Sequence, residues 1–334
     1  MPISKQVTLA RRPEAHVDSS VLRIDEVTVS EPADGEVLIR NLVFSLDPYM
    51  RPRMDDEASY IEPFAVGAPL EGGAVGEVIA SRVPGIETGS HVIHMAGWRE
   101  YALLPGKAVR RLEPSDHPLS YHLGVLGMPG LTAYAGLVSV AGLGRGESLF
   151  VSSAAGTVGS LAGQMAKLLG AGRVIGSAGS PQKVSYVRDE LGFDAVIDYR
   201  ATPIMDSLGR AAADGGIDVY FDNVGGDHFA AALSHLNDFG RVVMCGTISS
   251  YDDPATRTIP GNLFDIVRKR LRIAGLYVND HVATAGDFSR DVGQWLRDGK
   301  LEVREVKFQG LESAPEAFFG LLRGDHTGKV LVEL

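Results

Sequence analysis

Between residues 123 and 304, short apolar runs alternate with amphipathic stretches, and this alternation limits the fold more than any other feature of the chain. The run 148–152 (SLFVS) has the composition of a continuous apolar strand buried on both faces. Apolar residues then recur three and four positions apart from Val158 to Leu169, as on one face of a helix. Further strands are expected at 173–176, 195–198, 217–221, 241–245 and 271–276, and helices at 181–191 and about 284–298. Such alternation predicts a parallel, doubly wound α/β sheet.

Residues 1–122 have a different pattern, in which short strands are separated by turns. Strands are expected at 37–43, 72–79, 91–94 and 100–104. Strands of this length and spacing are typical of a small β-barrel or sandwich. The tail is strand-like again at 305–308 and 329–334. We therefore expect a β domain from residues 1–122, completed by 305–334, and an α/β domain from residues 123–304.

A glycine-containing turn joins the first strand of the α/β region to its first helix. The sequence over Ala154–Gly159 is AAGTVG, a dinucleotide-binding fingerprint with its first glycine replaced by Ala154. We expect Gly156 to let the backbone approach a pyrophosphate and Gly159 to let the helix pack against the strand. The helix N-terminus would supply amides and the positive end of a dipole. A tight turn without a ligand is the alternative, but the strand–turn–helix context favours nucleotide binding.

The segment after the second strand indicates which dinucleotide binds. NAD-dependent proteins usually carry an acidic residue about 20 positions after the glycines, which binds the ribose 2′-hydroxyl. Residues 176–183 (GSAGSPQK) contain no carboxylate, but they offer hydroxyls, free amides and Lys183, which suit a 2′-phosphate. We predict NADP, although Lys183 could also be a solvated surface lysine. Segments 221–226 and 245–249 also follow strands, where ligands of open α/β sheets bind, although ordinary loops share this pattern.

Composition excludes several other classes of protein. Lys plus Arg number 32 and Asp plus Glu 42, so the formal net charge is 32 − 42 = −10, which disfavours a nucleic-acid or anionic-membrane binder. No apolar run approaches the roughly 20 residues that span a bilayer. The first residues do not resemble a secretory signal, so a cytoplasmic protein is expected. Cys245 is the single cysteine, which excludes an intramolecular disulfide and a zinc site built from several thiolates.

Six sequence segments match motifs of a known protein family. They are LDPYMR (46–51), AGWREY (96–101), GMPGLTAY (127–134), AGTVG (155–159), FDNVGG (221–226) and CGTISSY (245–251). With these segments in this order, the chain resembles the zinc-independent medium-chain dehydrogenase/reductases over nearly its whole length. Within them it is similar to the branch of prostaglandin reductase (leukotriene B4 12-hydroxydehydrogenase), plant alkenal double-bond reductases and bacterial curcumin reductase.

The resemblance implies a GroES-like β-barrel domain, a Rossmann domain, NADPH in the cleft between them, and commonly a homodimer. It also implies cofactor-binding positions. Those expected at the pyrophosphate are Gly156, Thr157, Val158 and Gly159, and those at the adenosine phosphate end are Ser180, Lys183 and Tyr199. Those expected along the nicotinamide half are Asn223, Cys245, Gly246, Thr247, Ile248, Ser249, Tyr251, Leu276, Tyr277 and Val278.

Two positions depart from better-known members of this branch. Relatives often place a tyrosine near the substrate just before the sixth Rossmann strand, where this chain has Arg268. Mammalian and plant members have an asparagine near the cofactor in the last loop, where this chain has His326. Because of the first departure, the identity of the group that stabilises the enolate is undecided. Because of the second, the identity of one cofactor contact is undecided.

The expected chemistry follows from the residues that are missing. Carbonyl reduction in the zinc branch uses a Lewis acid, and Cys245 is the single thiol available as a ligand. His91 and His94 have two residues between them on a predicted strand, so they should face opposite sides and not share an ion. We therefore predict no functional metal. Reduction of a conjugated C=C bond is easier to support, with hydride going to the β-carbon and charge developing on the carbonyl oxygen.

The protein must then supply a hydrogen-bond donor to that oxygen and a source of the proton. Tyr49 and Tyr251 are the candidates, with Arg268 as a rival, although each tyrosine could instead be a packing residue. Cys245 is expected to be a small buried hydrophobe near the cofactor rather than a nucleophile. Two alternatives to an NADPH-dependent enone or enal reductase stay open, which are an NADPH:quinone reductase and a non-catalytic NADPH-binding sensor.

Overall fold

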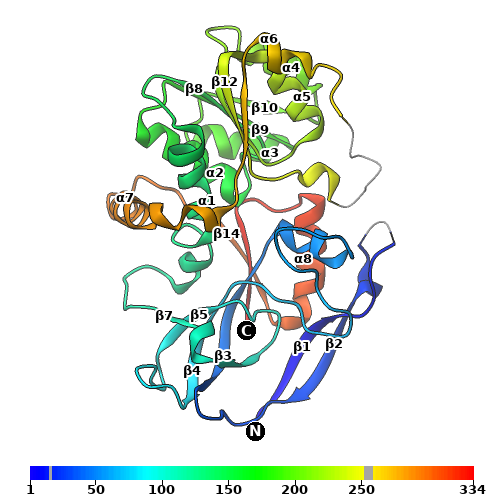
Figure 1. Cartoon of the computed structure of the whole chain (residues 1–334), viewed down its shortest axis with the longest axis vertical. Coiled ribbons are helices and arrows are strands. Elements are labelled where there is room, and N and C mark those ends of the chain that lie inside the picture. Colours follow the sequence, from blue (N-terminus) through cyan, green and yellow to red (C-terminus); the bar gives the residue numbers. More distant parts are fainter. Residues whose placement is uncertain (15–16, 252–258) are drawn as a thin grey trace. The chain divides into compact units, whose positions relative to one another are not determined.

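The computed structural model describes residues 1–14, 17–251 and 259–334. The chain divides into two compact units (Figure 1). The first unit consists of Met1–Leu123 together with Glu305–Leu334, and the second unit consists of Gly124–Arg304.

The second unit is built on a six-stranded parallel sheet. Its strands lie in the order β10-β9-β8-β11-β12-β13. Their bounds are β8 Ser148–Val151, β9 Arg173–Ala178, β10 Ala195–Asp198, β11 Ile217–Asp222, β12 Leu236–Met244 and β13 Arg272–Gly275. This is the strand order of the Rossmann fold, with the first strand in chain order at the centre and the direction of winding reversed between β8 and β11. The predicted doubly wound sheet is confirmed.

Helices cover both faces of this sheet (Figure 1). On one face, α4 and α5 pack with the side chains of Phe150 and Tyr220 in a single apolar cluster. On the other face, Gly136 lies against the ring of Phe221, and α2 contacts α1, β8 and β9. The helices are α1 Met128–Ala135, α2 Thr157–Leu169, α3 Pro181–Ser185, α4 Ile204–Ala211, α5 Gly226–His235, α6 Phe264–Arg268 and α7 Ala285–Arg297.

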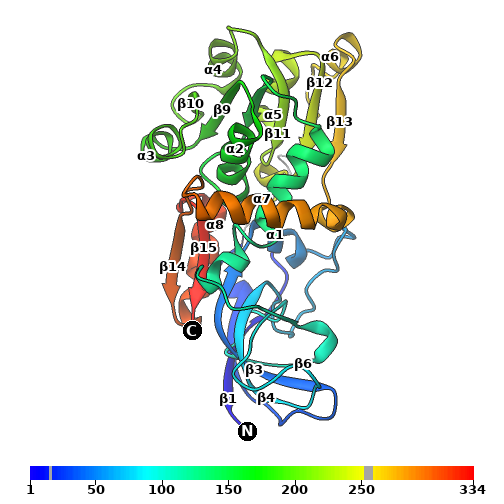
Figure 2. The ribbon, with the colours of Figure 1, turned by 90° about the vertical axis from the view of Figure 1, so that its left-hand side faces the viewer.

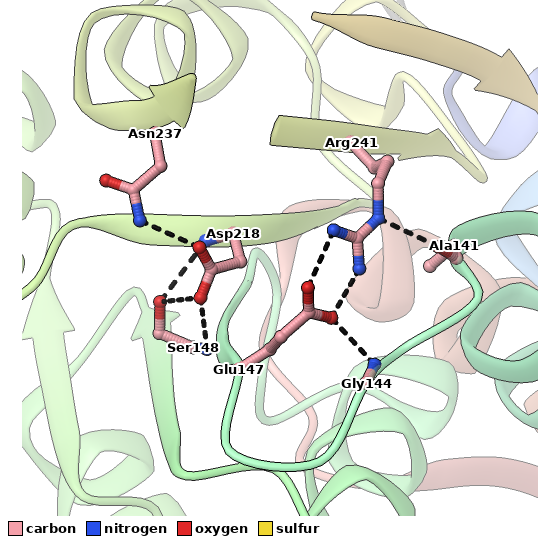
Figure 3. Close-up of polar contacts among 7 residues, drawn as sticks. All are labelled: Ala141, Gly144, Glu147, Ser148, Asp218, Asn237 and Arg241. Atoms are coloured by element: carbon pink, nitrogen blue, oxygen red, sulfur yellow. Dashed lines mark hydrogen bonds and ion pairs between the residues drawn. The ribbon is translucent and has the colours of Figure 1, made fainter. Parts of the chain in front are cut away.

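A polar network fastens the amino-terminal edge of this sheet (Figure 3). Arg241 of β12 forms a two-pronged ion pair with Glu147, which precedes β8. Asp218 of β11 accepts hydrogen bonds from the Ser148 amide at 2.8 Å and from Asn237 at 2.8 Å. Burial opposes ionisation of Asp218, but these hydrogen bonds outweigh it and lower the pKa of the carboxyl. The network ties β8, β11 and β12 together at the end opposite their carboxyl termini.

The first unit holds a seven-stranded sheet and a two-stranded one. The larger sheet has the order β14-β15-β3-β4-β5-β7, with β6 paired to β3, and the smaller sheet pairs β1 with β2. The strands are β1 Ile3–Leu9, β2 Leu22–Thr28, β3 Glu36–Leu46, β4 Ala74–Ser81, β5 His91–His94, β6 Tyr101–Pro105, β7 Arg110–Arg111, β14 Glu305–Gln309 and β15 Lys329–Glu333. Figure 2 shows β14 beside β15, and β15 is antiparallel to β3. The expected return of the tail to the N-terminal sheet is therefore seen.

A buried core joins the two sheets of the first unit to α8 (Ala314–Arg323). Trp98 lies at its centre, fully buried and in ring contact with Phe44 and Phe318. The segment after β3 forms two short 3-10 turns, η2 (Pro48–Met50) and η3 (Pro52–Met54), and Met50 and Met54 pack into this core. This packing holds the LDPYMR segment against the domain.

Candidate functional site

The predicted nucleotide-binding residues of the second unit lie on loops at one edge of its sheet. Because the strands are parallel, the segments that follow β8, β9, β10, β11, β12 and β13 all emerge at the carboxyl edge. In open α/β sheets, ligands bind outside this edge, next to the point where the winding reverses. Here that point lies between β8 and β11. It is flanked by the turn after β8 and by Asn223 after β11.

The turn after β8 carries the predicted glycines from the strand into the N-terminus of α2. Helix α2 begins at Thr157 with Gly156 as its N-cap, and no side chain caps it. The amides of Thr157, Val158 and Gly159 lie in the first turn of this helix, the position from which helix N-termini bind anions in nucleotide-binding proteins. A Cβ atom at Gly159 would lie 2.2 Å from the carbonyl oxygen of Ser153. Glycine at this position thus permits the close packing of helix on strand that the fingerprint predicts.

The loop after β9 carries the residues predicted to distinguish NADP from NAD. Ser180 is the N-cap of α3, and its hydroxyl accepts a hydrogen bond from the Lys183 amide at 3.3 Å. Lys183 is therefore on the first turn of that helix. The hydroxyl of Tyr199, after β10, would lie 2.6 Å from a Cβ at Gly179, so its ring covers this glycine. The ring of His228 stands edge-on to Tyr199 at 4.9 Å.

Asp222 organises the loop after β11, and the sequence analysis did not single it out. Its Oδ1 accepts hydrogen bonds from the hydroxyl of Tyr220 at 2.6 Å and from the amides of Val224 and Gly225 at 2.9 and 2.8 Å. Burial raises the pKa of this carboxyl. Asn223, which was predicted, donates from Nδ2 to the Ser152 carbonyl at 2.8 Å. These bonds fix the β11 loop against the β8 loop. An acidic residue at a strand end, with glycines three and four positions later, was the signal for this role.

The loop after β12 is hydrogen-bonded to Asp222 as well. The amides of Cys245 and Gly246 donate to the Asp222 carbonyl at 2.8 and 3.0 Å. The Tyr251 hydroxyl lies within hydrogen-bond reach of the Thr247 amide at 3.5 Å. Its loop also includes Ile248 and Ser249, whose amides donate to Asn223 and Val224 carbonyls, respectively.

Cys245 lies half-buried at the end of β12. Burial raises the pKa of its thiol to about 12. Nucleophilic cysteines are those whose pKa is lowered, because the thiolate is the reactive form. The raised pKa supports the prediction that Cys245 is a packing residue rather than a nucleophile, which stays a prediction.

The segment after β13 completes this edge. The Leu276 amide continues the pairing by donating to the Met244 carbonyl at 2.9 Å. The Tyr277 hydroxyl accepts a hydrogen bond from Asn279 at 2.7 Å, and Val278 begins a 3-10 turn. Leu276, Tyr277 and Val278 therefore lie at the end of the sheet's outer strand, at the same edge as the β12 loop.

Tyr49 lies in the first unit, and the environment of its hydroxyl bears on its predicted role. Its ring packs against the apolar core, and its hydroxyl is buried without a hydrogen-bond partner among the described residues. Burial, followed by the negative charge of Asp47, raises the pKa of this phenol. The phenol is therefore protonated at neutral pH, and its hydroxyl can donate a hydrogen bond. Buried hydroxyls without a partner are rare in folded proteins, so this one calls for an explanation.

Arg268 and His326 do not lie among the carboxyl-edge loops of the second unit. Arg268 ends α6, its side chain is 58% exposed, and it pairs with Asp265 on the same helix at 2.8 Å. The next residue, Lys269, binds the last carbonyls of α5 just before β12 begins, which is the amino-terminal edge of the sheet. Arg268 is thus at the opposite edge from the predicted cofactor residues. His326 belongs to the first unit, where it packs over Gly320 and the ring of Phe308.

The two histidines of β5 face opposite sides, as predicted. His91 is exposed and His94 is buried. The Nδ1 of His94 accepts a hydrogen bond from the Ala96 amide at 3.1 Å, and burial lowers the pKa of this imidazole to about 4. Among the described residues, no group of three or more His, Cys, Asp or Glu could hold a metal ion. In the same part of the chain, no helix is long and apolar enough to cross a membrane.

Both parts of the chain match families of known oxidoreductases. Residues 5–112 match the family described as the N-terminal domain of oxidoreductase, and residues 157–296 match the family described as zinc-binding dehydrogenase. Together with the strand order and the glycine turn, these matches define a nucleotide-dependent oxidoreductase with two domains.

Relatives of established name cover the whole chain. It is 39% identical to the NADPH-dependent curcumin reductase of Escherichia coli, over 99% of this chain and 97% of the relative. It is also 39% identical to the NADP-dependent 2-alkenal reductase of Nicotiana tabacum, over 98% and 97%, and 35% identical to prostaglandin reductase 1 of Rattus norvegicus, over 99% of each. The chain belongs to the medium-chain dehydrogenase/reductases, in the branch of these three reductases, which confirms the predicted family.

Solved structures agree with this placement. The structure of CurA from Vibrio vulnificus in complex with NADPH is similar with a TM-score of 0.93 and 39% identity, over 98% of each chain. A quinone oxidoreductase of Escherichia coli complexed with NADPH is similar with a TM-score of 0.80 but 22% identity, over 99% of this chain and 100% of that one. The second likeness shows the fold alone.

Proposed function

We propose that this protein is an NADPH-dependent reductase of the C=C bond in α,β-unsaturated ketones or aldehydes. The observation that carries the proposal is full-length similarity, at nearly two-fifths identity, to reductases named for curcumin and 2-alkenals. The quinone oxidoreductases share the fold at much lower identity, so the quinone alternative has weaker support.

The residues present fit an NADPH cofactor. The glycine turn is shaped so that a Cβ at Gly159 would overlap backbone, and the helix that follows has no side-chain cap. The loop after β9 has a hydroxyl at Ser180 and an ammonium at Lys183 in place of a carboxylate. We assign Gly156–Gly159 to the pyrophosphate, Ser180, Lys183 and Tyr199 to the adenosine phosphate, and the β11, β12 and β13 loops to the nicotinamide half. NADPH, when bound, supplies the hydride.

Tyr49 is the proposed donor to the carbonyl oxygen of the substrate. Its hydroxyl is protonated and has no partner among residues 1–14, 17–251 and 259–334. In the proposed reaction it stabilises the charge that develops on that oxygen as the β-carbon accepts hydride. Tyr251 is the second candidate, although its hydroxyl is already within reach of the Thr247 amide. The proposed reaction uses no metal ion. Stoichiometric zinc by elemental analysis, with activity lost to a chelator and restored by zinc, would refute this.

We further propose that the protein is a cytoplasmic homodimer. Strand β13 supports dimer formation, because it is the outermost strand of its sheet and its four residues are exposed. Exposed edge strands pair readily with another chain. The neighbouring α6 adds exposed apolar side chains, Phe264 and Val267. Light scattering on the purified protein tests the dimer, and cell fractionation tests the location.

Turnover of a small panel of substrates tests the proposed function. NADPH absorbance is followed with an enal, an enone and a quinone at equal concentration. The proposal expects the enal or enone to be reduced with the higher kcat/KM. Faster turnover of the quinone would favour the quinone reductase. NADPH binding without turnover of any of the three would favour a sensor.

A further inference from the structure

Ser45, Asp47 and Lys329 form a buried charge cluster next to the turn that carries Tyr49. The Nζ atom of Lys329 contacts Asp47 Oδ1 at 2.6 Å and the Leu46 carbonyl at 3.1 Å, and it also donates to the hydroxyl of Ser45. The Ser45 hydroxyl in turn donates to the other carboxylate oxygen of Asp47. The Lys329 side chain is 2% exposed. All three donor positions of the ammonium are therefore satisfied by a segment that lies more than 280 residues away in the sequence.

The cluster sets the point at which β3 ends. Strand β15 pairs with β3 so that Val330 is opposite Leu46, which brings Lys329 to the residue where the chain leaves the strand. The next three residues, Pro48–Met50, form the turn η2 with Tyr49 at its centre. The ammonium of Lys329, on the neighbouring strand, thus binds the residues that directly precede the turn with Tyr49.

Asp47 has a second possible set of partners that it does not use. It occupies the N-cap position of η2 with extended backbone angles, yet its side chain makes no capping hydrogen bond. An aspartate at an N-cap ordinarily accepts hydrogen bonds from the amides of the turn that follows. Lys329 and Ser45 take both carboxylate oxygens instead. Without Lys329, the carboxylate would be free to rotate toward the η2 amides and move Tyr49.

We propose that Lys329 is a positioning residue for the reaction, which acts through Asp47 to hold the Tyr49 hydroxyl where it can meet the carbonyl oxygen of the substrate. The proposal rests on the function proposed above, with Tyr49 as donor. The buried pair fixes the backbone on the N-terminal side of Tyr49, and the packing of Met50 in the core fixes it on the other side. Among the described residues, the hydroxyl has no hydrogen-bond partner. Within that part of the chain, its position is set by its backbone and by the packing of its ring.

Lys329→Met removes the charge and keeps the length of the side chain. We expect kcat/KM for an enone to fall about 10- to 100-fold, because displacement of a reacting group by about 1 Å has costs of this order. The KM for NADPH should stay within about twofold, because the predicted cofactor residues at the carboxyl edge belong to the second unit. Lys307→Met is the matched control. Lys307 lies on β14 and forms an exposed ion pair with Glu333, which is on β15 as Lys329 is. We expect the loss of this ion pair to leave the rate unchanged.

Two double variants separate positioning from folding stability. Asp47→Asn with Lys329→Met removes both buried charges, and such a replacement often restores stability. We expect the melting temperature to recover while kcat/KM stays low. In a Tyr49→Phe background, Lys329→Met should cost less than about twofold more, because the two residues act as a unit.

Recovery of the rate together with stability, or losses that multiply in the Tyr49→Phe background, would show that Lys329 has only a structural role. A full rate for Lys329→Met would overturn the proposal outright. Absence of enone turnover by the unaltered protein would overturn the proposed function, and this inference with it, and is seen before any variant is made.

Discussion

At the scale of single residues, the chemistry depends on which polar groups are satisfied inside the protein and which are not. The Tyr49 hydroxyl is buried and unpartnered among the described residues, whereas Arg268 pairs with Asp265 on its own helix. The sequence identified both as candidate donors but could not separate them, because partners depend on the folded chain. We therefore propose Tyr49 rather than Arg268 as the donor, which kinetics must test.

Tyr49→Phe should lower kcat/KM for enones on the order of 10²–10³-fold, since one preorganised donor to a developing oxyanion has an effect of this size. The ring is kept, so packing and NADPH affinity should survive. Arg268→Ala is the control, and we expect it to keep full activity because the side chain is exposed at the amino-terminal edge. Steady-state kinetics decide between them. Full activity for Tyr49→Phe with loss for Arg268→Ala would move the donor to Arg268.

Lys183→Ala should weaken NADPH binding by about one to two decades and leave NADH nearly unchanged. A hydrogen bond to a charged group contributes roughly 1.5–3 kcal/mol, which corresponds to this range of Kd. Arg188→Ala is the control, because Arg188 lies close by in sequence and pairs with Asp189. Calorimetric titration with each cofactor measures the effect. Equal losses for NADPH and NADH would show that Lys183 does not bind the 2′-phosphate.

At the scale of elements, the sequence predicts most strands of the second unit well and several helices poorly. It does not predict β1 and β2, and β12 begins at Leu236, five residues before the predicted start. The run 195–198 coincides with β10 and the run 91–94 with β5, because β-branched residues between turns leave few alternatives. The expected helix over 181–191 is instead α3 followed by a π-helical stretch at Tyr186–Glu190. Helices α1 and α5 were not predicted, since their Gly- and Ala-rich sequences have weak apolar periodicity.

Gly159→Ala tests the contact between α2 and β8. The added Cβ would lie 2.2 Å from the Ser153 carbonyl oxygen, which is backbone and cannot move aside. We expect a loss of about 1–3 kcal/mol in the free energy of unfolding, together with weaker NADPH binding. Gly286→Ala in α7 is the matched control, because its Cβ would meet no atom within 4 Å. Denaturant unfolding of both variants gives the comparison. Equal stability would contradict the close packing.

At the scale of the whole molecule, the contacts that matter join distant parts of the chain. Strand periodicity predicted that the tail returns to the first unit, but it could not predict that Lys329 would meet Asp47, 282 residues away. Likewise, Asp222 was recognised as part of a motif and not as an organiser of two loops. Its side chain accepts hydrogen bonds from its own loop, and its carbonyl accepts them from the loop after β12. A single sequence contains local patterns, whereas these pairings follow from the order of strands in the sheets.

Acidification should destabilise the protein through its buried histidines. Burial lowers the pKa of His94 and of His228 to about 4, below the value of about 6.5 in unfolded chains. Between these values the unfolded state binds more protons, so stability falls as pH decreases from about 6.5 to about 4. The slope should be up to about 1.4 kcal/mol per pH unit for each histidine. Urea unfolding across this range should show a smaller slope for His94→Gln, whereas His91→Gln on the same strand should match the unaltered protein.

The most direct test of the central claim is the identity of the product formed from a simple enone with NADPH deuterated at the transferred position. We expect a saturated ketone with deuterium on the β-carbon, as NMR and mass spectrometry would show. The carbonyl group should be intact, and a solvent proton should be found on the α-carbon. An allylic alcohol as the main product, with deuterium on the former carbonyl carbon, would contradict reduction of the C=C bond by this protein.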